Sequence, residues 1–328
     1  FIHYKHPKTF LFHNLQREHC LCGVLAFYGI ISINMTLYII ANPHAGNHGA
    51  KQVISDIEKH HTSDICTLLT RYKNDELHQV EKLLKTFDPE KDKLLIVGGD
   101  GTLSKVLYHL PANLPFAYYP VGSGNDFARA LGIVPNLDTL LVSLTNQPKG
   151  ITVYSYQECL VLNSLDLGFA AWVVNQATNS TLKTVLNKCH LGKLTYVAIA
   201  IQFLLKNPLQ ASVSLESSEG DNLILNDHFF FSLANNTYFG GGIMIWPTAT
   251  VHSENLECVY AKGETFFQRL TVLLSLVLKR HEKSSYLNHC SLKQVTVNFP
   301  KESLIEIDGE IVSLNEITLS SQKRYIYL

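Results

Sequence analysis

The chain has 328 residues, of which 46% are hydrophobic and 17% are charged, and its 27 basic residues nearly balance its 28 acidic ones. This length favours two domains, and this composition excludes an intrinsically disordered chain. Because the net charge is close to zero and no basic block is present, no nucleic-acid partner is expected.

The first 34 residues differ in character from those that follow. Residues 1–19 are rich in His and Lys, whereas residues 21–41 are nearly all apolar. Since residues 36–41 are required as a strand, about 14 apolar residues remain, which are too few for a membrane-spanning helix. A secretory cleavage site would fall inside that strand. We interpret residues 1–34 as an appended leader outside the core; a hairpin that dips into a membrane is the alternative.

From Met35 the chain alternates between predicted strands and helices. The strands cover residues 36–41, 64–70, 93–97 and 116–121. Apolar residues at helical spacing predict helices with faces formed by Ala50, Val53, Ile54 and Ile57, by Leu77, Val80, Leu84 and Phe87, and by Leu103, Val106, Leu107 and Leu110. This alternation is typical of a parallel sheet covered on both faces. We expect residues 35–148 to form such an α/β domain.

Three of the four predicted strands end in a corner that contains glycine, at residues 42–46, 98–102 and 122–126. Parallel sheets bind ligands at the carboxyl ends of their strands, where glycine admits a close backbone approach and the first amides of a helix attract phosphate. Asp100 cannot hold phosphate, because like charges repel, so we expect its carboxylate to meet a metal ion or a hydroxyl proton. The pattern favours phosphoryl transfer, and three simple turns are the alternative.

The second half of the chain, residues 149–328, is predicted to be a β-rich domain after a linker at residues 146–150. Short β-branched or aromatic strands are predicted at residues 152–156, 159–165, 211–215, 223–225, 229–234, 256–261, 295–299 and 304–307. Two helices, at residues 191–206 and 264–280, interrupt them. We expect a mostly antiparallel sheet or sandwich.

Five motifs follow one another along the chain. They are Asn42-Pro43-x-Ala45-Gly46, Gly98-Gly99-Asp100-Gly101-Thr102, Gly122-x-Gly124-Asn125-Asp126-Phe127-Ala128-Arg129, Gly240-Gly241-Gly242 with Pro247, and Asp308-Gly309-Glu310. Their order resembles that of the diacylglycerol kinase-like lipid kinases, particularly the soluble bacterial kind. The Gly-Gly-Asp-Gly run is shared with NAD kinases and phosphofructokinases, whereas the third and fifth motifs are more specific. The resemblance implies an N-terminal α/β domain, a β-rich C-terminal domain, and ATP in the cleft between them.

The resemblance also implies which residues bind the nucleotide and its Mg²⁺. The nucleotide-binding residues would be Asn42, Pro43, Ala45, Gly46, Thr70, Gly98, Gly99, Asp100, Gly101, Thr102, Gly122, Ser123, Gly124, Asn125 and Asp126. Asp100 and Asp126 would organise the metal ion and its water. Considered alone, an Asn-Asp pair is more often a helix cap.

The candidate catalytic residues lie in the last motif and in the second. As bare residues, Asp308 and Glu310 around Gly309 indicate a surface hairpin. In the family that turn reaches the cleft and its glutamate is the favoured general base. Glu310 is therefore the first candidate, Asp308 the second, and Asp100 the third catalytic residue. No Walker lysine is present, which excludes a P-loop enzyme.

Two positions depart from the family pattern. Ser253 stands where an aspartate that supports a structural Mg²⁺ is expected, and Glu254 and Glu257 are its nearest substitutes. Ala170 replaces an expected acidic residue. We therefore assign no structural metal.

Together, these patterns predict an ATP- and Mg²⁺-dependent kinase for the hydroxyl of diacylglycerol or a related lipid alcohol. An NAD kinase-like small-molecule kinase and a non-catalytic lipid- or nucleotide-binding protein remain alternatives. The apolar stripe within residues 266–278, followed by Lys279, Arg280 and Lys283, fits core packing or a membrane surface. We expect a lipid substrate and a transient membrane surface as partners. The sequence does not decide whether the protein forms a homodimer. Seven scattered cysteines indicate reduced thiols, so we expect a cytoplasmic, peripherally membrane-associated protein.

Overall fold

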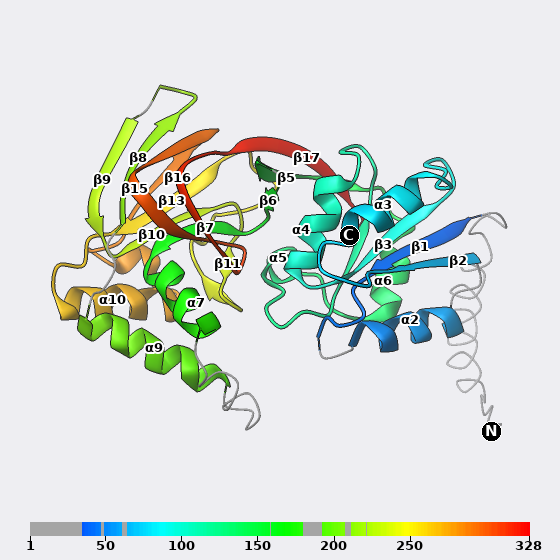
Figure 1. Ribbon diagram of the computed structural model, residues 1–328, viewed down its shortest axis with the longest axis horizontal. Coiled ribbons are helices and arrows are strands. Elements are labelled where there is room, and N and C mark those ends of the chain that lie inside the picture. The colour runs from blue at the N-terminus through cyan, green and yellow to red at the C-terminus, as the bar shows by residue number, and fades with distance from the viewer. Residues whose placement is uncertain are drawn as a thin grey trace, which may run out of the picture.

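The computed structural model describes residues 35–46, 49–60, 64–157, 159–179, 192–206, 211–220 and 222–328 (Figure 1). The leader expected at residues 1–34 lies outside the described residues. The described elements form two bodies, with the early blue and cyan elements on the right of Figure 1. Within the described ranges, no helix combines the length and the apolar composition that crossing a membrane requires.

The N-terminal sheet has four parallel strands in the order β2-β1-β3-β4. They are β1 (Thr36–Ala41), β2 (Asp64–Leu69), β3 (Lys93–Gly98) and β4 (Ala117–Pro120). Parallel neighbours need crossover connections. The helices of this half are α2 (Gly49–His60), α3 (Glu76–Leu84), α4 (Asp100–His109), α5 (Asp126–Ala130) and α6 (Leu137–Ser143). The predicted parallel α/β architecture is confirmed.

Alternating side chains along β1 explain why both faces of this sheet are covered. Leu37 and Ile39 pack with residues of α2 and α6 in one buried cluster. Tyr38 and Ile40 pack with residues of α3 and α4 in another. Strands that are apolar on both faces are typical of parallel sheets.

The larger sheet of the C-terminal half is antiparallel in the order β14-β13-β10-β7-β15-β8-β9, with β16 paired to β15. Its strands are β7 (Ser164–Gly168), β8 (Ala211–Ser217), β9 (Asn222–His228), β10 (Phe230–Ala234), β13 (Leu256–Ala261), β14 (Asn288–Leu292), β15 (Val295–Ile307) and β16 (Glu310–Thr318). Leu165, Phe231 and Val297 belong to the buried cluster on one face. The expected antiparallel, β-rich second half is confirmed.

Helices cover the other face of this sheet. They are α7 (Phe169–Asn179), α9 (Gly192–Lys206) and α10 (Phe266–Val277), followed by the 3-10 helix η1 (His281–Lys283). Phe203 of α9 and Val272 of α10 share a buried cluster with Phe230 and Val259 of the sheet. A ribbon of β11 (Tyr238–Phe239) and β12 (Ile243–Met244) contacts α5 of the first half.

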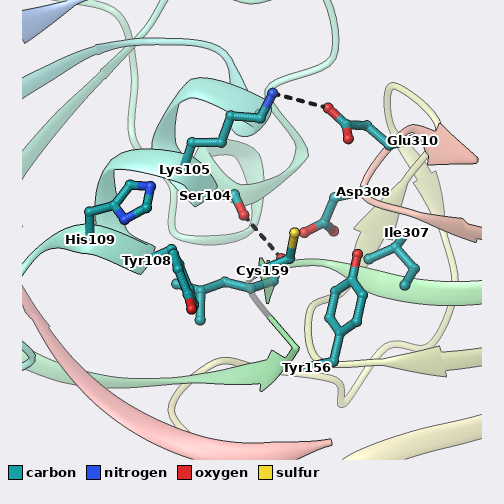
Figure 2. Close-up of a pocket in the computed structure, with 11 residues that line it drawn as sticks. Ser104, Lys105, Tyr108, His109, Tyr156, Cys159, Ile307, Asp308 and Glu310 are labelled. Carbon is teal, nitrogen blue, oxygen red and sulfur yellow. Dashed lines mark hydrogen bonds and ion pairs between the residues drawn. The ribbon is translucent and has the colours of Figure 1, made fainter. Parts of the chain in front are cut away.

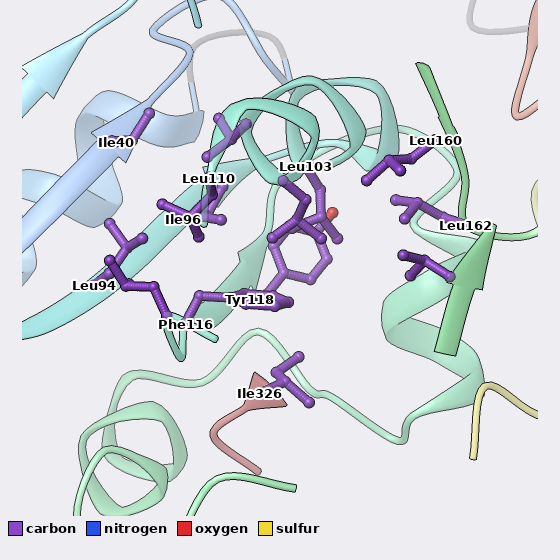
Figure 3. Packing of buried hydrophobic residues seen from close by; sticks show 14 of the residues in the cluster. Ile40, Leu94, Ile96, Leu103, Leu110, Phe116, Tyr118, Leu160, Leu162 and Ile326 are labelled. Atoms are coloured by element: carbon purple, nitrogen blue, oxygen red, sulfur yellow. The ribbon is translucent and has the colours of Figure 1, made fainter. Parts of the chain in front are cut away.

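A three-stranded antiparallel sheet joins the two bodies. It consists of β5 (Lys149–Tyr156), β6 (Cys159–Val161) and β17 (Ser320–Ile326), in the order β17-β5-β6. Leu160 and Ile326 pack with Tyr118 in the N-terminal core (Figure 3). Tyr154, in contrast, packs in the core of the larger sheet. The last strand of the chain therefore returns to the first half, as the red ribbon of Figure 1 shows.

Some predicted strands differ from the observed ones. Residues 159–165 are two strands in different sheets, because the chain bends at Leu162 and Asn163. Residues 295–299 and 304–307 belong to one long strand, whose pairing is irregular between Asn298 and Ser303. The sequence did not predict β16 because partly exposed residues dominate it and blur its alternation.

Candidate active site

Three strand ends meet at one edge of the N-terminal sheet. In the strand register, Ala41 at the end of β1 lies beside Val97. Gly98 at the end of β3 lies beside Pro120 at the end of β4. The corners that follow these strands are therefore neighbours in space.

Close backbone contacts join the corners and require glycine at two positions. Gly46 has a φ of +57°, and a Cβ built there would lie 1.6 Å from the carbonyl oxygen of Val121. A Cβ on Gly122 would lie 2.6 Å from the Cα of Gly99. A residue with a side chain cannot approach so closely. The third corner thus contacts both the first and the second.

Helix α4 begins directly after the second corner. Its N-cap residue, Gly99, has extended backbone angles, and no described side chain caps its first turn. Amides at a helix start lack partners within the helix and carry partial positive charge, so this end suits an anionic group. Asn42 of the first corner reaches the same turn, since its Nδ2 donates to Thr102 Oγ1 at 3.4 Å.

Asp100 and Asp126 are the first residues of α4 and α5 and lie next to each other. The Asp126 N–H donates to Asp100 Oδ2 at 2.9 Å. Both oxygens of Asp126 are also occupied, because Arg129 donates to Oδ1 and the Gly241 N–H donates to Oδ2 at 2.7 Å. Asp100 Oδ1 is buried and accepts no hydrogen bond from any described residue. We refer to this oxygen, which lacks a hydrogen-bond partner, as the open oxygen; the buried Tyr118 hydroxyl lies close to the same carboxyl group.

Burial raises the pKa of both carboxyl groups. Removal from water, together with the Asp126 charge, raises the pKa of Asp100 to about 6. Burial also raises the pKa of Asp126, although the Gly241 N–H and Arg129 oppose this shift. A cation beside the pair would stabilise the ionised forms. The open oxygen and the raised pKa therefore fit a divalent cation.

Water and phosphate oxygens, rather than further side chains, would complete the coordination of a cation at Asp100 and Asp126. Among the described residues, no three or more His, Cys, Asp or Glu side chains gather into a metal site. Mg²⁺ in phosphate-transfer sites usually takes only one or two carboxylates, together with water and phosphate oxygens. Asp100 and Asp126 are sufficient for that arrangement.

The remaining predicted nucleotide residues border the same edge of the sheet. Thr70 follows β2, is buried, and donates its N–H to the Ala41 carbonyl at 2.9 Å. Pro43 is also buried, and the Ala45 N–H donates to the Asn42 carbonyl at 3.1 Å. These residues shape the first corner.

A hydrogen bond from the Asn125 side chain stabilises the third corner. Asn125 has a left-handed φ of +53°, and its Nδ2 donates to the Gly122 carbonyl at 2.8 Å. Ser123 is exposed between them. A Cβ on Gly124 would lie 3.8 Å from Asp126 Oδ2 and 3.9 Å from Asp100 Oδ2. At Gly124, therefore, the backbone lies next to the carboxylates of Asp100 and Asp126 with no side chain between them.

Asp308 and Gly309 form the two-residue turn between β15 and β16. Ile307 pairs with Glu310 across the turn, and the two turn residues have φ angles of +48° and +91°. Two consecutive positive angles are typical of a type I′ hairpin, the turn that an Asp-Gly sequence favours.

The Asp308 carboxylate is fixed by the bend between β6 and β7. Its Oδ2 accepts the Leu162 N–H at 2.6 Å, and its Oδ1 accepts those of Asn163 and Ser164 at 2.8 and 3.2 Å. Removal from water, with a contribution from the Asp100 charge, nevertheless raises the pKa of Asp308 to about 7. Carboxylates from the two halves of the chain therefore lie within electrostatic reach of each other.

Glu310 directly follows the turn and is exposed. Its Oε1 lies 3.4 Å from Lys105 Nζ on α4 (Figure 2). Gly101, the neighbour of Asp100, lines the same pocket as Glu310 and Asp308. The acids of the last motif thus face a pocket that residues from the start of α4 also line.

A second pair of carboxyl groups lies beneath this turn. Asp166 on β7 and Glu306 on β15 are partners in the strand register, and both are buried. Burial raises the pKa of each, and the two groups repel each other when ionised. Such a pair retains a proton. Glu306 also accepts the Gly309 N–H, which ties the pair to the turn.

The sequence-based assignment missed three groups. Arg129 was part of a motif, and its i,i+3 spacing from Asp126 was a usable signal for their ion pair. Lys105 gave no local signal, because its partner Glu310 is distant in the sequence. The amide of Gly241 is likewise a distant partner, although its glycine run was noted.

The positions that depart from the family pattern offer no open carboxylate. Ser253 Oγ accepts the Asn255 N–H at 3.0 Å within a turn. Glu254 pairs with Lys323 at 2.8 Å, and Glu257 accepts a hydrogen bond from His289. Ala170 is buried at the start of α7. These contacts give no support for a structural metal at this place.

Comparison with known families covers most of the chain. The diacylglycerol kinase catalytic domain matches residues 36–155, and the YegS C-terminal NAD kinase beta sandwich-like domain matches residues 165–322. A Staphylococcus epidermidis protein named "Putative lipid kinase" is 28% identical over 291 residues, which are 82% of this chain and 87% of that protein.

Two further matches span nearly the whole of the matched proteins. "Putative lipid kinase YtlR" of Bacillus subtilis is 21% identical over 305 residues, which are 87% of this chain and 96% of that protein. The crystal structure of a "putative diacylglycerol kinase" from Bacillus anthracis superposes with a TM-score of 0.67 at 18% identity. It covers 90% of this chain and 96% of that one, and it confirms the fold.

Proposed function

Because the chain belongs to the diacylglycerol kinase-like family, we propose that it transfers the γ-phosphate of ATP to the hydroxyl of diacylglycerol or a related lipid alcohol. The observation that carries the proposal is the shared pocket of Gly101, Asp308 and Glu310. It brings acids of the last motif to the helix start that carries Asp100. Phosphoryl transfer requires positioned phosphates, neutralised charge and a base near the acceptor hydroxyl.

The nucleotide phosphates would bind at the three glycine corners. The start of α4 offers amides there, and the contact between Gly99 and Gly122 leaves backbone rather than side chains facing the ligand. Asn42 and Thr102, which already share a hydrogen bond, would orient the phosphates from the first corner.

Asp100 and Asp126 would hold Mg²⁺ at the edge of these corners. The open oxygen Asp100 Oδ1 is the candidate direct ligand, and Asp126, which Arg129 and Gly241 fix, would act through water. When bound, the metal ion neutralises charge on the phosphate oxygens. With it in place, the Asp100 carboxyl would stay ionised at neutral pH, because an adjacent cation lowers its pKa.

Glu310 would take the proton of the acceptor hydroxyl. It is exposed at the pocket, so an acceptor can reach it, and its ion pair with Lys105 is a partly exposed contact of low strength. Asp308 has both oxygens bonded to backbone amides, so its role would be to position the turn. This division favours Glu310 over Asp308 as the base.

Labelled ATP tests the proposal directly. The purified protein is incubated with γ-labelled ATP and Mg²⁺, and with diacylglycerol in mixed micelles, a total lipid extract or NAD⁺, and the products are separated by chromatography. We expect label in a lipid product that Glu310→Gln does not form. Label in NADP⁺ alone would instead identify a small-molecule kinase. Nucleotide binding without any labelled product would identify a binding protein.

A further inference from the structure

Helix α10 exposes large apolar side chains on the side that does not pack on the sheet. Its buried residues are Arg269, Val272, Ser275 and Leu276. The exposed apolar residues in and directly after it are Phe267, Leu274, Val277 and Leu278, with exposed fractions from 47% to 76%. A surface helix of a globular protein normally shows the opposite arrangement. Packing on the sheet therefore does not explain this composition.

The neighbouring helix α9 also exposes apolar side chains. Ile201 and Leu205, four residues apart, are 52% and 68% exposed. The two helices are in contact, because Arg269 donates to the Leu204 carbonyl at 2.9 Å. Figure 1 shows both on the side of the larger sheet that faces away from β17. We refer to the six exposed residues, Ile201, Leu205, Phe267, Leu274, Val277 and Leu278, as the apolar face.

Basic residues outnumber acidic ones at the ends of the two helices. The exposed basic residues at the ends of the two helices are Lys206, Lys262, Lys279, Arg280 and Lys283. The exposed acidic residues there are Glu264 and Glu282. Apolar side chains bordered by an excess of cations suit insertion among anionic lipid headgroups. A second copy of the chain would present the same positive border, and like charges would oppose its docking.

The end of α10 also lies close to the candidate active site. Lys279 Nζ lies 6.0 Å from the centre of the Tyr238 ring, and the Arg129 guanidinium carbon lies 5.8 Å from the same centre. Arg129 in turn pairs with Asp126. One aromatic ring thus separates the cationic end of the apolar face from the acidic pair.

We propose that the apolar face of α9 and α10 docks the protein on an anionic membrane surface, with the Lys279 end placed next to the site that receives the lipid. This inference rests on the proposed function, because a lipid acceptor must be taken from a membrane. Docking would bring the candidate active site to the depth of the headgroups, where the acceptor hydroxyl lies.

Vesicle cosedimentation tests this surface without requiring catalysis. The full chain is mixed with phosphatidylcholine vesicles with and without phosphatidylglycerol. We expect tighter binding to the anionic vesicles, and weakening by salt. Phe267→Glu combined with Leu274→Glu should reduce binding at least about tenfold, since it removes insertion and adds repulsion. Arg280→Glu with Lys283→Glu should weaken the preference for anionic vesicles by at least about fivefold for each lost cation.

The matched control is Val134→Glu combined with Val142→Glu, which places the same two charges on 62% and 56% exposed apolar residues of the N-terminal half. Phosphorylation of a soluble short-chain diacylglycerol should be unchanged in all three variants, which separates docking from catalysis. Wild-type vesicle binding by Phe267→Glu with Leu274→Glu would overturn the proposal. A wild-type dimer that these substitutions convert to a monomer, with vesicle binding retained, would assign the face to self-association. If no lipid is phosphorylated, the vesicle measurements still decide the docking.

Discussion

The substitution Gly124→Ala separates the chemistry of the site from the stability of the fold. The added methyl group would lie 3.8 Å from Asp126 Oδ2 and 3.9 Å from Asp100 Oδ2, at ordinary van der Waals distances. The folded chain can therefore accept it without displacement of its neighbours. We expect the free energy of unfolding to change by less than about 1 kcal/mol.

The same methyl group fills space beside the Oδ2 atoms of both carboxylates, next to the place proposed for the metal ion and its water. It stands beside both carboxylates, and it excludes one contact between a charged group and water or phosphate. Such contacts contribute about 1.5–3 kcal/mol, which corresponds to roughly a tenfold to hundredfold loss in transfer rate or in affinity for Mg²⁺ and ATP. Gly49→Ala is the control, because its nearest atom, Val121 Cβ, is 3.9 Å away and no carboxylate lies within 4 Å.

Urea denaturation and the initial rate of labelled lipid formation measure the two effects independently. The expected result for Gly124→Ala is wild-type stability with a reduced rate, whereas Gly49→Ala retains both. If Gly124→Ala transfers phosphate at the wild-type rate with unchanged nucleotide affinity, the ligand does not occupy the space beside the two carboxylates. Equal losses in both variants would also refute the reasoning.

Three more predictions concern charge. Because the folded protein holds the Asp100 pKa at about 6, above its ordinary range, it binds protons more tightly than the unfolded chain does. The free energy of unfolding should therefore fall as the pH rises from about 4 to 7, by about 3 kcal/mol for this group, and Asp100→Asn should flatten the fall in urea titrations. An equal slope in the variant would contradict this. Asp308→Asn should cost about 1–3 kcal/mol in the same assay, because an amide presents only one acceptor oxygen to three N–H donors, and an unchanged midpoint would contradict it. Chelation of divalent cations should abolish lipid phosphorylation, and Asp126→Asn should raise the Mg²⁺ concentration needed for half the maximal rate; activity that survives chelation would exclude the metal.

The glycine corners and the Asp308 turn could be predicted from the sequence, because each depends on residues that are adjacent in the chain. Each corner is encoded by a buried strand with a glycine at its end or within the next five residues, and the parallel register then aligns the strand ends without further information. The Asp308 turn is equally local, because Asp-Gly alone favours a two-residue hairpin. Local encoding is why these elements were predictable.

The contacts that join the two halves could not be predicted in this way. The Asp308 carboxylate accepts hydrogen bonds from amides at a bend within residues 159–165. The sequence pattern predicted one strand there, whereas the fold has two. The return of β17 to the first half is also invisible in its own residues, because its partner β5 is distant in the chain. Such pairings depend on tertiary packing rather than on local propensity.

The central claim is that a base from the C-terminal half acts on a nucleotide held by the N-terminal half. The most direct measurement is lipid phosphorylation by Glu310→Gln, together with its affinity for ATP and Mg²⁺, with the exposed Glu316→Gln of the same strand as the control. The account predicts at least about a hundredfold loss of transfer, affinity within about threefold of wild type, and full activity in the control. Transfer by Glu310→Gln at the wild-type rate would contradict it.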